Sequence, residues 1–131
     1  MGRSGLMLLD TCALLWLARE DKHLSDQARQ RIIAAPIVYV SAISGFELAL
    51  KCRAGKLTLP MPALQWFSQL AIHHDLCVLE LSLDVCVRAA ELPPIHKDPC
   101  DRFIIATAMA NDLSVVTADP RFAEYGIVTL C

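Results

Sequence analysis

Four acidic side chains stand where an apolar segment of the chain begins or ends. Asp10 follows the first apolar run, and Asp119 comes two residues after Val115-Val116-Thr117. Glu47 and Asp101 lie in the opening turns of two segments that are predicted to be helical. A carboxylate at the edge of an apolar core is costly unless it is paired, hydrogen-bonded or bound to a metal. These positions are therefore the first candidates for chemistry.

The densest group of polar residues is His96-Lys97-Asp98-Pro99-Cys100-Asp101-Arg102, which opens an almost wholly apolar segment. Asp98 has the position of a helix N-cap, Pro99 that of the first helical residue, and Asp101 lies three residues past the cap. Capping is a sufficient explanation for Asp98. The residues that follow leave almost no polar face, so this helix is predicted to be packed on most sides. Asp101 would then be held at the edge of a core.

Strands alternate with helices along the chain. Strands are predicted at Leu6–Leu9, Ile37–Val40, Leu76–Leu81, Leu113–Thr117 and Ile127–Leu130. Helices are predicted at Ala13–Arg19, Gln27–Ala35, Ser44 to Gly55, Ala63–His74, Ser82–Glu91 and Asp98 to about Asn111. Ser44 is interpreted as the cap of the third helix, with Glu47 at the capping-box position. The alternation predicts an α/β fold with a central parallel sheet of four to five strands and helices on both faces.

In an open parallel sheet, the carboxyl ends of the strands share one edge with the amino ends of the following helices. The four acids are therefore expected to face one crevice. Each alone has a local explanation as a cap or, for Glu47, as an ion pair with Lys51. Two carboxylates about 4 Å apart repel by ~4 kcal/mol at an effective dielectric near 20, and a helix amino end offsets only ~0.3–1 kcal/mol. A cluster without matching Lys or Arg therefore indicates a divalent cation.

Oxygen-only ligation favours Mg²⁺ or Mn²⁺ over zinc. Such an ion can activate water and offset the charge of a phosphate during an in-line displacement. The predicted chemistry is the hydrolysis of phosphate esters. Several basic residues lie near the same edge and are candidates for phosphate contacts: Lys51, Arg53, Lys56, Lys97, Arg102 and Arg121.

Length and composition limit the classes of protein that fit. At 131 residues the chain is predicted to be one domain, with residues 1–5 as a flexible leader. A net charge of −2 argues against coating nucleic acid by bulk charge, and six scattered cysteines without a Cys-x-x-Cys pair indicate reduced thiols. The start of the chain lacks a signal-peptide pattern, and prolines interrupt the run Leu57–His74, so a cytoplasmic protein without a membrane span is expected. A hydrophobic content of 55% indicates an apolar surface that a partner covers.

Taken together, four segments resemble the PIN-domain family, and within it the VapC-type ribonuclease toxins of toxin–antitoxin pairs. The resemblance spans nearly the whole chain in the family's order. The segments are Leu8-Leu9-Asp10-Thr11-Cys12-Ala13-Leu14-Leu15-Trp16, Ser41-x-x-Ser44-x-Phe46-Glu47-Leu48-Ala49-Leu50-Lys51 with Gly55-Lys56-Leu57, His96-x-Asp98-Pro99-x-Asp101-Arg102-x-Ile104-Ile105-Ala106-x-Ala108, and Val115-Val116-Thr117-x-Asp119-x-x-Phe122.

The resemblance implies a Mg²⁺- or Mn²⁺-dependent endoribonuclease that leaves 5′-phosphate and 3′-hydroxyl ends. Asp10, Glu47, Asp101 and Asp119 match the acidic quartet that holds the metal, and Glu47 is expected to orient or deprotonate the attacking water. The resemblance further implies an RNA substrate, a VapB-type antitoxin that covers the site, and a homodimer. Secondary candidates beside the pocket are Asp98, Thr11, Thr117, Arg102 and His96.

Two other functions share part of this pattern. A phosphoryl-receiver domain also uses strand-end acids and Mg²⁺, but it expects an adjacent acid pair after the first strand and a late lysine. Here Asp10 is followed by Thr11, and no lysine occurs after Lys97. A catalytically silent binding module with the same fold is the other alternative. For His96, a structural hydrogen-bonding role is favoured over a role as a base or phosphate contact.

Overall fold

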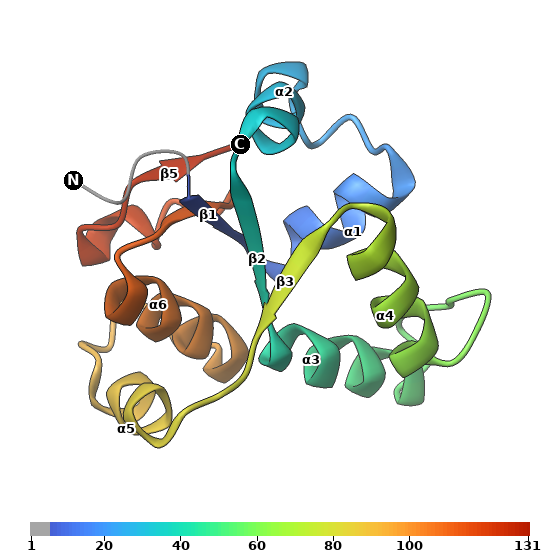
Figure 1. Cartoon of the computed structure of the whole chain (residues 1–131). Coiled ribbons are helices and arrows are strands. Elements are labelled where there is room, and N and C mark those ends of the chain that lie inside the picture. The colour runs from blue at the N-terminus through green and yellow to red at the C-terminus, as the bar shows by residue number, and fades with distance from the viewer. Residues whose placement is uncertain (1–5) are drawn as a thin grey trace.

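A parallel sheet crosses the centre of the fold, and helices cover both of its faces (Figure 1). The computed structural model describes residues 6–131, so the expected leader at residues 1–5 lies outside the described residues. Over that range the elements are β1 (Leu6–Leu9), α1 (Thr11–Arg19), α2 (Asp26–Ala34), β2 (Ile37–Ser41), α3 (Ala42–Arg53), α4 (Ala63–His73), β3 (Leu76–Leu79), α5 (Leu83–Glu91), α6 (Pro99–Asn111), β4 (Ser114–Val116), a 3₁₀ turn (Ala123–Tyr125) and β5 (Thr129–Leu130).

The strand order within residues 6–131 is β3-β2-β1-β4-β5, and every neighbouring pair is parallel. The predicted α/β architecture is therefore confirmed. The chain runs outward from β1 to β2 and β3, then returns to the other side of β1 for β4 and β5. Ligands of open parallel sheets bind at such a reversal, beside the carboxyl ends of the strands. Asp10 and Asp119 follow the two strands that meet there.

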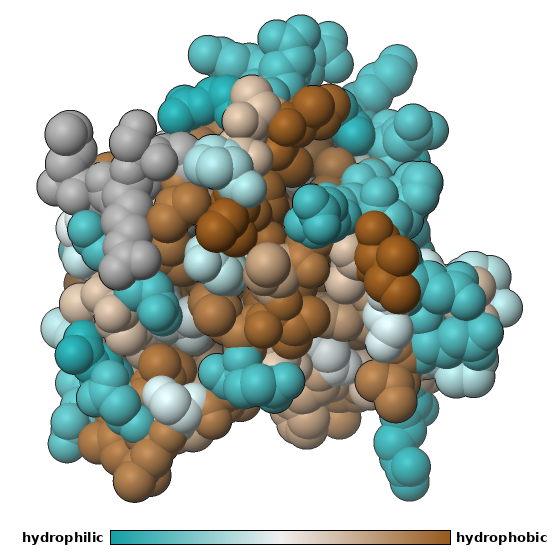
Figure 2. Space-filling view, viewed as in Figure 1, coloured by the Kyte–Doolittle hydropathy of each residue, from teal (hydrophilic) through white to brown (hydrophobic). Residues whose placement is uncertain are grey.

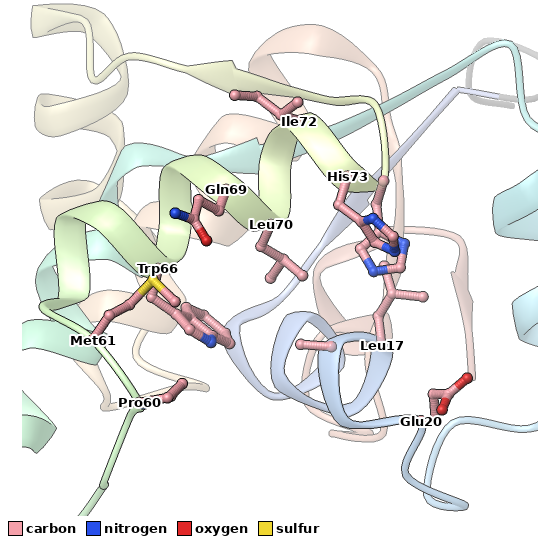
Figure 3. Close-up of a pocket in the computed structure, with 11 residues that line it drawn as sticks. Leu17, Glu20, Pro60, Met61, Trp66, Gln69, Leu70, Ile72 and His73 are labelled. Atoms are coloured by element: carbon pink, nitrogen blue, oxygen red, sulfur yellow. The ribbon is translucent and has the colours of Figure 1, made fainter.

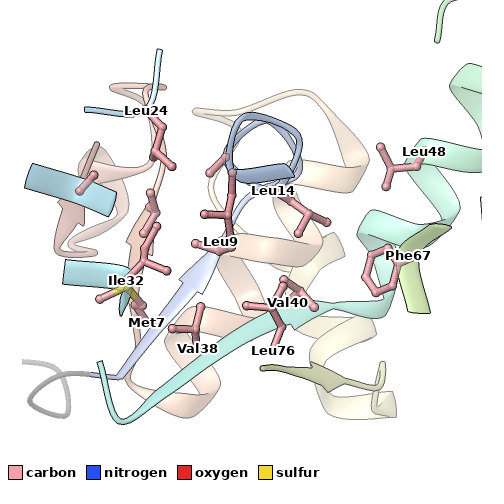
Figure 4. Packing of buried hydrophobic residues seen from close by; sticks show 14 residues of the cluster. Met7, Leu9, Leu14, Leu24, Ile32, Val38, Val40, Leu48, Phe67 and Leu76 are labelled. Atoms are coloured by element: carbon pink, nitrogen blue, oxygen red, sulfur yellow. The ribbon is translucent and has the colours of Figure 1, made fainter. Parts of the chain in front are cut away.

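The sheet separates two apolar clusters. Met7, Leu9 and Val116 point into one cluster with α1, α2 and α4, whereas Leu8 and Val115 point into the other with α6. Figure 4 shows the first cluster, in which strand side chains pack beneath the helices. Burial on both faces explains why the strands read as continuous apolar runs rather than as alternating patterns.

Most helices begin at the capping residues that the sequence indicated. Ser25 and Ser82 cap α2 and α5, and Asp98 caps α6 with Pro99 as its first residue. Over residues 6–131, no helix is long and apolar enough to cross a bilayer. Within the uncharged run Leu57–His74, which raised this question, only Ala63–His73 is helical and forms α4.

The predicted start of the third helix is wrong. Ser41, the last residue of β2, caps α3 by accepting a hydrogen bond from the Ile43 amide at 3.1 Å. The strand enters the helix without a loop, so Ser44 already lies inside α3. Its hydroxyl pairs with that of Thr11 at 2.8 Å and joins α3 to α1. Glu47 therefore lies in the second turn of α3 and takes no part in a capping box.

Candidate active site

The four predicted acids come from four elements and meet at the carboxyl edge of the sheet. Asp10 caps α1 directly after β1, Glu47 lies in α3, Asp101 lies in the first turn of α6, and Asp119 follows β4. The charges of the other three acids each raise the pKa of Asp101, which requires all four to share one neighbourhood. The convergence that the sequence predicted is therefore present.

Burial dominates the electrostatics of Asp10 and Asp101. It is the main cause that raises the pKa of Asp101 to about 7, and the charges of Asp98, Glu47, Asp10 and Asp119 add to it. Burial also raises the pKa of Asp10, although hydrogen bonds from Thr117 and from the Ala13 amide oppose the shift. The Thr117 hydroxyl in turn accepts a hydrogen bond from the Asp119 amide at 3.1 Å. Thr117 thus links the two acids that follow neighbouring strands.

Glu47 has one occupied and one free carboxylate oxygen. Oε2 lies 3.4 Å from Lys51 Nζ, which is the ion pair that the i,i+4 spacing predicts. Oε1 is buried and has no hydrogen-bond partner among residues 6–131. A buried acceptor without a partner is costly. This oxygen therefore points to a ligand that the protein alone does not supply.

Asp119 is the opposite case, because donors surround its carboxylate. Arg121 donates from its backbone amide, Nε and Nη2 at 2.9–3.0 Å, and His96 Nε2 lies 2.8 Å from Oδ2. Burial acts to raise its pKa, but these hydrogen bonds outweigh it and lower the pKa to about 2. The expectation that no Lys or Arg balances the acids is therefore wrong for Asp119, whereas the contact of Glu47 with Lys51 is the ion pair that the sequence predicted.

His96 is buried between the acids, with 2% of its surface exposed. Its Nε2 lies 2.8 Å from Asp119 Oδ2 and 3.2 Å from Asp101 Oδ2. One ligand-type atom of each of these three residues lies within 4.8 Å of the others. The predicted hydrogen-bonding role fits, but the sequence carried no signal that the ring would lie inside the acidic group.

Three secondary candidates have other partners. All five N–H donors of the Arg102 guanidinium are used by backbone carbonyls, so the expected phosphate contact is wrong. Those carbonyls belong to Ala89, Ala90, Leu92, Pro93 and His96, at the end of α5 and in the loop before α6. The Thr11 hydroxyl is directed at Ser44, and Asp98 acts as the cap of α6 by accepting from the Cys100 amide at 2.9 Å.

The site fits a hard divalent cation. It presents carboxylate oxygens from several elements, and Asp101 lies within 4.0 Å of no Lys or Arg nitrogen among the described residues. The raised pKa of Asp101 and the unpartnered Glu47 Oε1 show that excess negative character is not balanced on this side of the site. Oxygen donors of this kind are those that Mg²⁺ and Mn²⁺ prefer.

A hollow of about 730 Å³ lies away from these acids, between α1 and α4 (Figure 3). Trp66 and Leu70 of α4 face Leu17 of α1 across it, and His73 lies at one end. None of the four acids lines this hollow.

Comparison with known proteins identifies the class. The PIN domain profile matches residues 7–128, so the chain belongs to the PIN-domain family. It is also 36% identical over 120 residues to Ribonuclease VapC22 of Mycobacterium tuberculosis, and the match covers 91% of each chain. The predicted family is therefore confirmed down to its VapC branch. The phosphoryl-receiver interpretation does not stand.

Solved structures agree on the fold. The VapBC2 structure from Rickettsia felis bound to a promoter DNA fragment has a TM-score of 0.68 at 16% identity, covering 95% of this chain and 97% of that chain. A toxin–antitoxin complex from Klebsiella pneumoniae has a TM-score of 0.65 at 23% identity, covering 94% of this chain and 96% of that chain.

Proposed function

We propose that this chain is a metal-dependent endoribonuclease and the toxin of a VapBC pair, acting on RNA in the cytoplasm. The observation that carries this proposal is the group of Asp10, Glu47 and Asp101, which shares one edge of the sheet and lacks a balancing cation at Asp101. The ribonuclease name of the 36% identical relative supports the same chemistry. Products with 5′-phosphate and 3′-hydroxyl ends are part of the proposal.

In this mechanism Asp10, Asp101 and Asp119 hold Mg²⁺ or Mn²⁺ directly or through water, together with Glu47. When bound, such an ion would offset negative charge on the phosphate and lower the pKa of a water molecule in the site. Lys51 holds Glu47 by Oε2, which leaves Oε1 to accept a hydrogen bond and then a proton from that water. Asp119 already has four donors, so it joins the metal site only by exchanging one of them, and Arg121 is the exposed one.

The test is RNA cleavage by the purified chain, with and without EDTA, followed with a labelled RNA pool. Asp10→Asn and Asp101→Asn keep the side-chain shape but remove a charge from the site. We expect each to lower cleavage by about a hundredfold to a thousandfold, since an ion that stabilises the transition state is worth several kcal/mol. Asp84→Asn is the matched control, because Asp84 lies on α5 in an exposed pair with Arg88. Cleavage that survives EDTA, or that both site variants retain, contradicts the proposal.

The same experiment distinguishes a nuclease from a catalytically silent binding module. An inert module would give no cleavage and no calorimetric signal with Mn²⁺. A nuclease gives both, and both disappear in Asp101→Asn.

We further propose a VapB-type antitoxin as the protein partner. A hollow of about 470 Å³ between α3 and α4 is lined by small and apolar residues, among them Gly45, Phe46, Leu64 and Val78. Phe46 is 57% exposed and Leu64 is 81% exposed, which is costly for a surface that stays bare. Figure 2 shows further hydrophobic residues across the middle of this face, where β3 forms an edge of the sheet. The structural matches to toxin–antitoxin complexes favour an antitoxin segment as the occupant.

Co-expression with the small protein of the neighbouring reading frame tests this partner. We expect a stable complex, inhibition of cleavage, and loss of both in Phe46→Ser. Leu83→Ser on α5, also 81% exposed, is the matched control and should bind normally. Equal binding by both variants contradicts the proposed groove. Light scattering of the free chain tests the homodimer that the family resemblance implies.

A further inference from the structure

Hydrogen bonds of its backbone and a contact with an aromatic ring fix the position of His96. Its backbone amide donates to the Tyr125 hydroxyl at 2.8 Å, and its carbonyl accepts from Arg102 Nη1 at 2.9 Å. Tyr125 in turn donates to the Pro93 carbonyl at 2.6 Å. The Phe122 ring meets the imidazole edge to face, with the ring centroids 5.7 Å apart. The ring is therefore buried in a single orientation.

The contacts of the imidazole determine its tautomer. Nδ1 lies 3.2 Å from the backbone nitrogen of Asp98, and a backbone N–H is always a donor. Nδ1 must therefore accept, and a neutral imidazole then carries its proton on Nε2. Nε2 faces Oδ2 of both Asp119 and Asp101, which are acceptors. Every polar group of His96 has a partner of the correct kind.

This arrangement changes how the cluster of His96, Asp101 and Asp119 is interpreted. The spacing of their atoms alone suggests a three-residue metal site that includes a histidine ligand. An imidazole nitrogen binds a metal through its lone pair, and a protonated Nε2 has none to offer. Nδ1 has a lone pair, but it is directed at the Asp98 amide.

We propose that His96 is a positioning residue of the metal site and not a ligand. Its Nε2–H donates to Asp119 Oδ2, and Nε2 also lies 3.2 Å from Asp101 Oδ2, so the ring ties the start of α6 to the loop after β4. The N–H dipole offsets the repulsion between the two carboxylates, so they stay together before a cation binds. Asp101 keeps its Oδ1 for the ion. This role rests on the proposed function, since it concerns the same site.

The tautomer is measured directly by ¹⁵N NMR of the full chain with labelled histidine, in EDTA and at saturating Mg²⁺. We expect Nε2 of His96 to be protonated in both states. His23 is an internal control, because its Nδ1 lies 2.6 Å from Asp21 Oδ1 and must be the protonated nitrogen there. A proton on Nδ1 of His96, or a change at Nε2 that indicates coordination when Mg²⁺ is added, overturns the proposal.

Substitutions separate positioning from simple folding. Gln places an amide N–H near the position of Nε2, whereas Leu fills the space without a donor. We expect His96→Leu to weaken Mn²⁺ binding about tenfold to a hundredfold in calorimetry, as for other groups that orient a ligand. His96→Gln should restore affinity to within about threefold of the wild type. His73→Leu, which changes an exposed histidine on α4, is the matched control.

The outcomes distinguish this inference from the proposed function. A wild-type chain that binds no Mn²⁺ contradicts the proposed function itself. Normal Mn²⁺ affinity in His96→Leu, with only a lower melting temperature in EDTA, contradicts the positioning role alone. Equal losses in the Gln and Leu variants also contradict it, because the donor would then not be what matters.

Discussion

The acidic site has two unlike halves. In the rim half, Asp119 is surrounded by Arg121 and His96, and its pKa is lowered to about 2. In the core half, which consists of Asp10, Glu47 and Asp101, burial and mutual repulsion raise the pKa of Asp101 to about 7. Both halves are built from carboxylates at strand or helix ends. Their difference lies in what surrounds each carboxylate.

The rim half is complete within the chain, whereas in the core half Lys51 contacts only Glu47, and no Lys or Arg among the described residues contacts Asp10 or Asp101. Stability and cation binding should therefore depend on the two halves in opposite ways. An acid that already has donors stabilises the fold without an ion. An acid that is buried among other acids is destabilising until an ion arrives, as is common for functional sites.

The largest expected effect is stabilisation by the cation itself. A ligand at a hundred times its Kd stabilises the folded state by about 2.7 kcal/mol, which for a domain of this size corresponds to roughly 10 °C in melting temperature. We expect a shift of this size on adding Mn²⁺, measured by scanning calorimetry. Asp101→Asn should remove most of it, and the α5 variant Asp84→Asn should keep it. An equal shift in both variants would mean that the ion binds elsewhere.

The second effect is a pair of substitutions that should change the melting temperature in opposite directions, measured in EDTA at neutral pH. Asp101→Asn removes a buried charge that its neighbours repel, and we expect the melting temperature to rise by about 4–8 °C. Asp119→Asn loses charged hydrogen bonds whose worth is reduced by solvent at the exposed Arg121, and we expect a fall of about 4 °C. Changes of the same sign would contradict the distinction between the halves.

Much of this arrangement could be predicted because it depends on local rules. Short apolar runs followed by capping residues located β1, β4 and the start of α6, and these place Asp10, Asp119 and Asp101. The parallel sheet then brings the three acids to one edge. Few topologies are possible for such a sheet, so the spacing of these acids along the chain was sufficient to predict that they meet.

The remaining details depend on contacts between distant segments, which no local pattern contains. Ser44 satisfied a capping pattern, but Ser41 lies earlier on a strand that runs directly into α3, and Thr11 takes the Ser44 hydroxyl. Arg102 was a candidate phosphate ligand in the sequence, but in the structure its guanidinium donates to backbone carbonyls of the loop before α6. The Asp119–Arg121 pair forms in a tight turn, whose two-residue spacing could have indicated it.

The third effect is a pH dependence of the metal-free protein. Between pH 4 and 7 the unfolded chain has released the Asp101 proton, because the ordinary pKa is 3.8, whereas the folded chain still holds it. The folded state binds more protons in this window, so stability falls as the pH rises. Asp119 acts in the opposite sense, but its contribution is lost only as the pH falls from 3.8 through about 2. We expect the melting temperature in EDTA to fall by about 3–5 °C from pH 5 to pH 7, since solvent at the partly exposed Asp101 carboxylate screens the effect of its raised pKa. Asp101→Asn should remove most of this fall, since Asp10, whose pKa is also raised, accounts for the remainder, and an undiminished fall would assign it to another group.

The smallest expected effect concerns the boundary between the halves, where Arg121 holds the Asp119 carboxylate that a cation would use. Arg121→Gln removes a competing positive charge, and an exposed ion pair is weak, so Mn²⁺ should bind only about twofold to threefold more tightly in calorimetry. Because the competing charge is half exposed, the gain should shrink at high salt. Arg88→Gln is the matched control, since Arg88 forms an exposed pair with Asp84 at 3.1 Å on α5. Weaker Mn²⁺ binding in Arg121→Gln would show that Arg121 orients Asp119 for the ion, and the rim half would then assist the core half instead of competing with it.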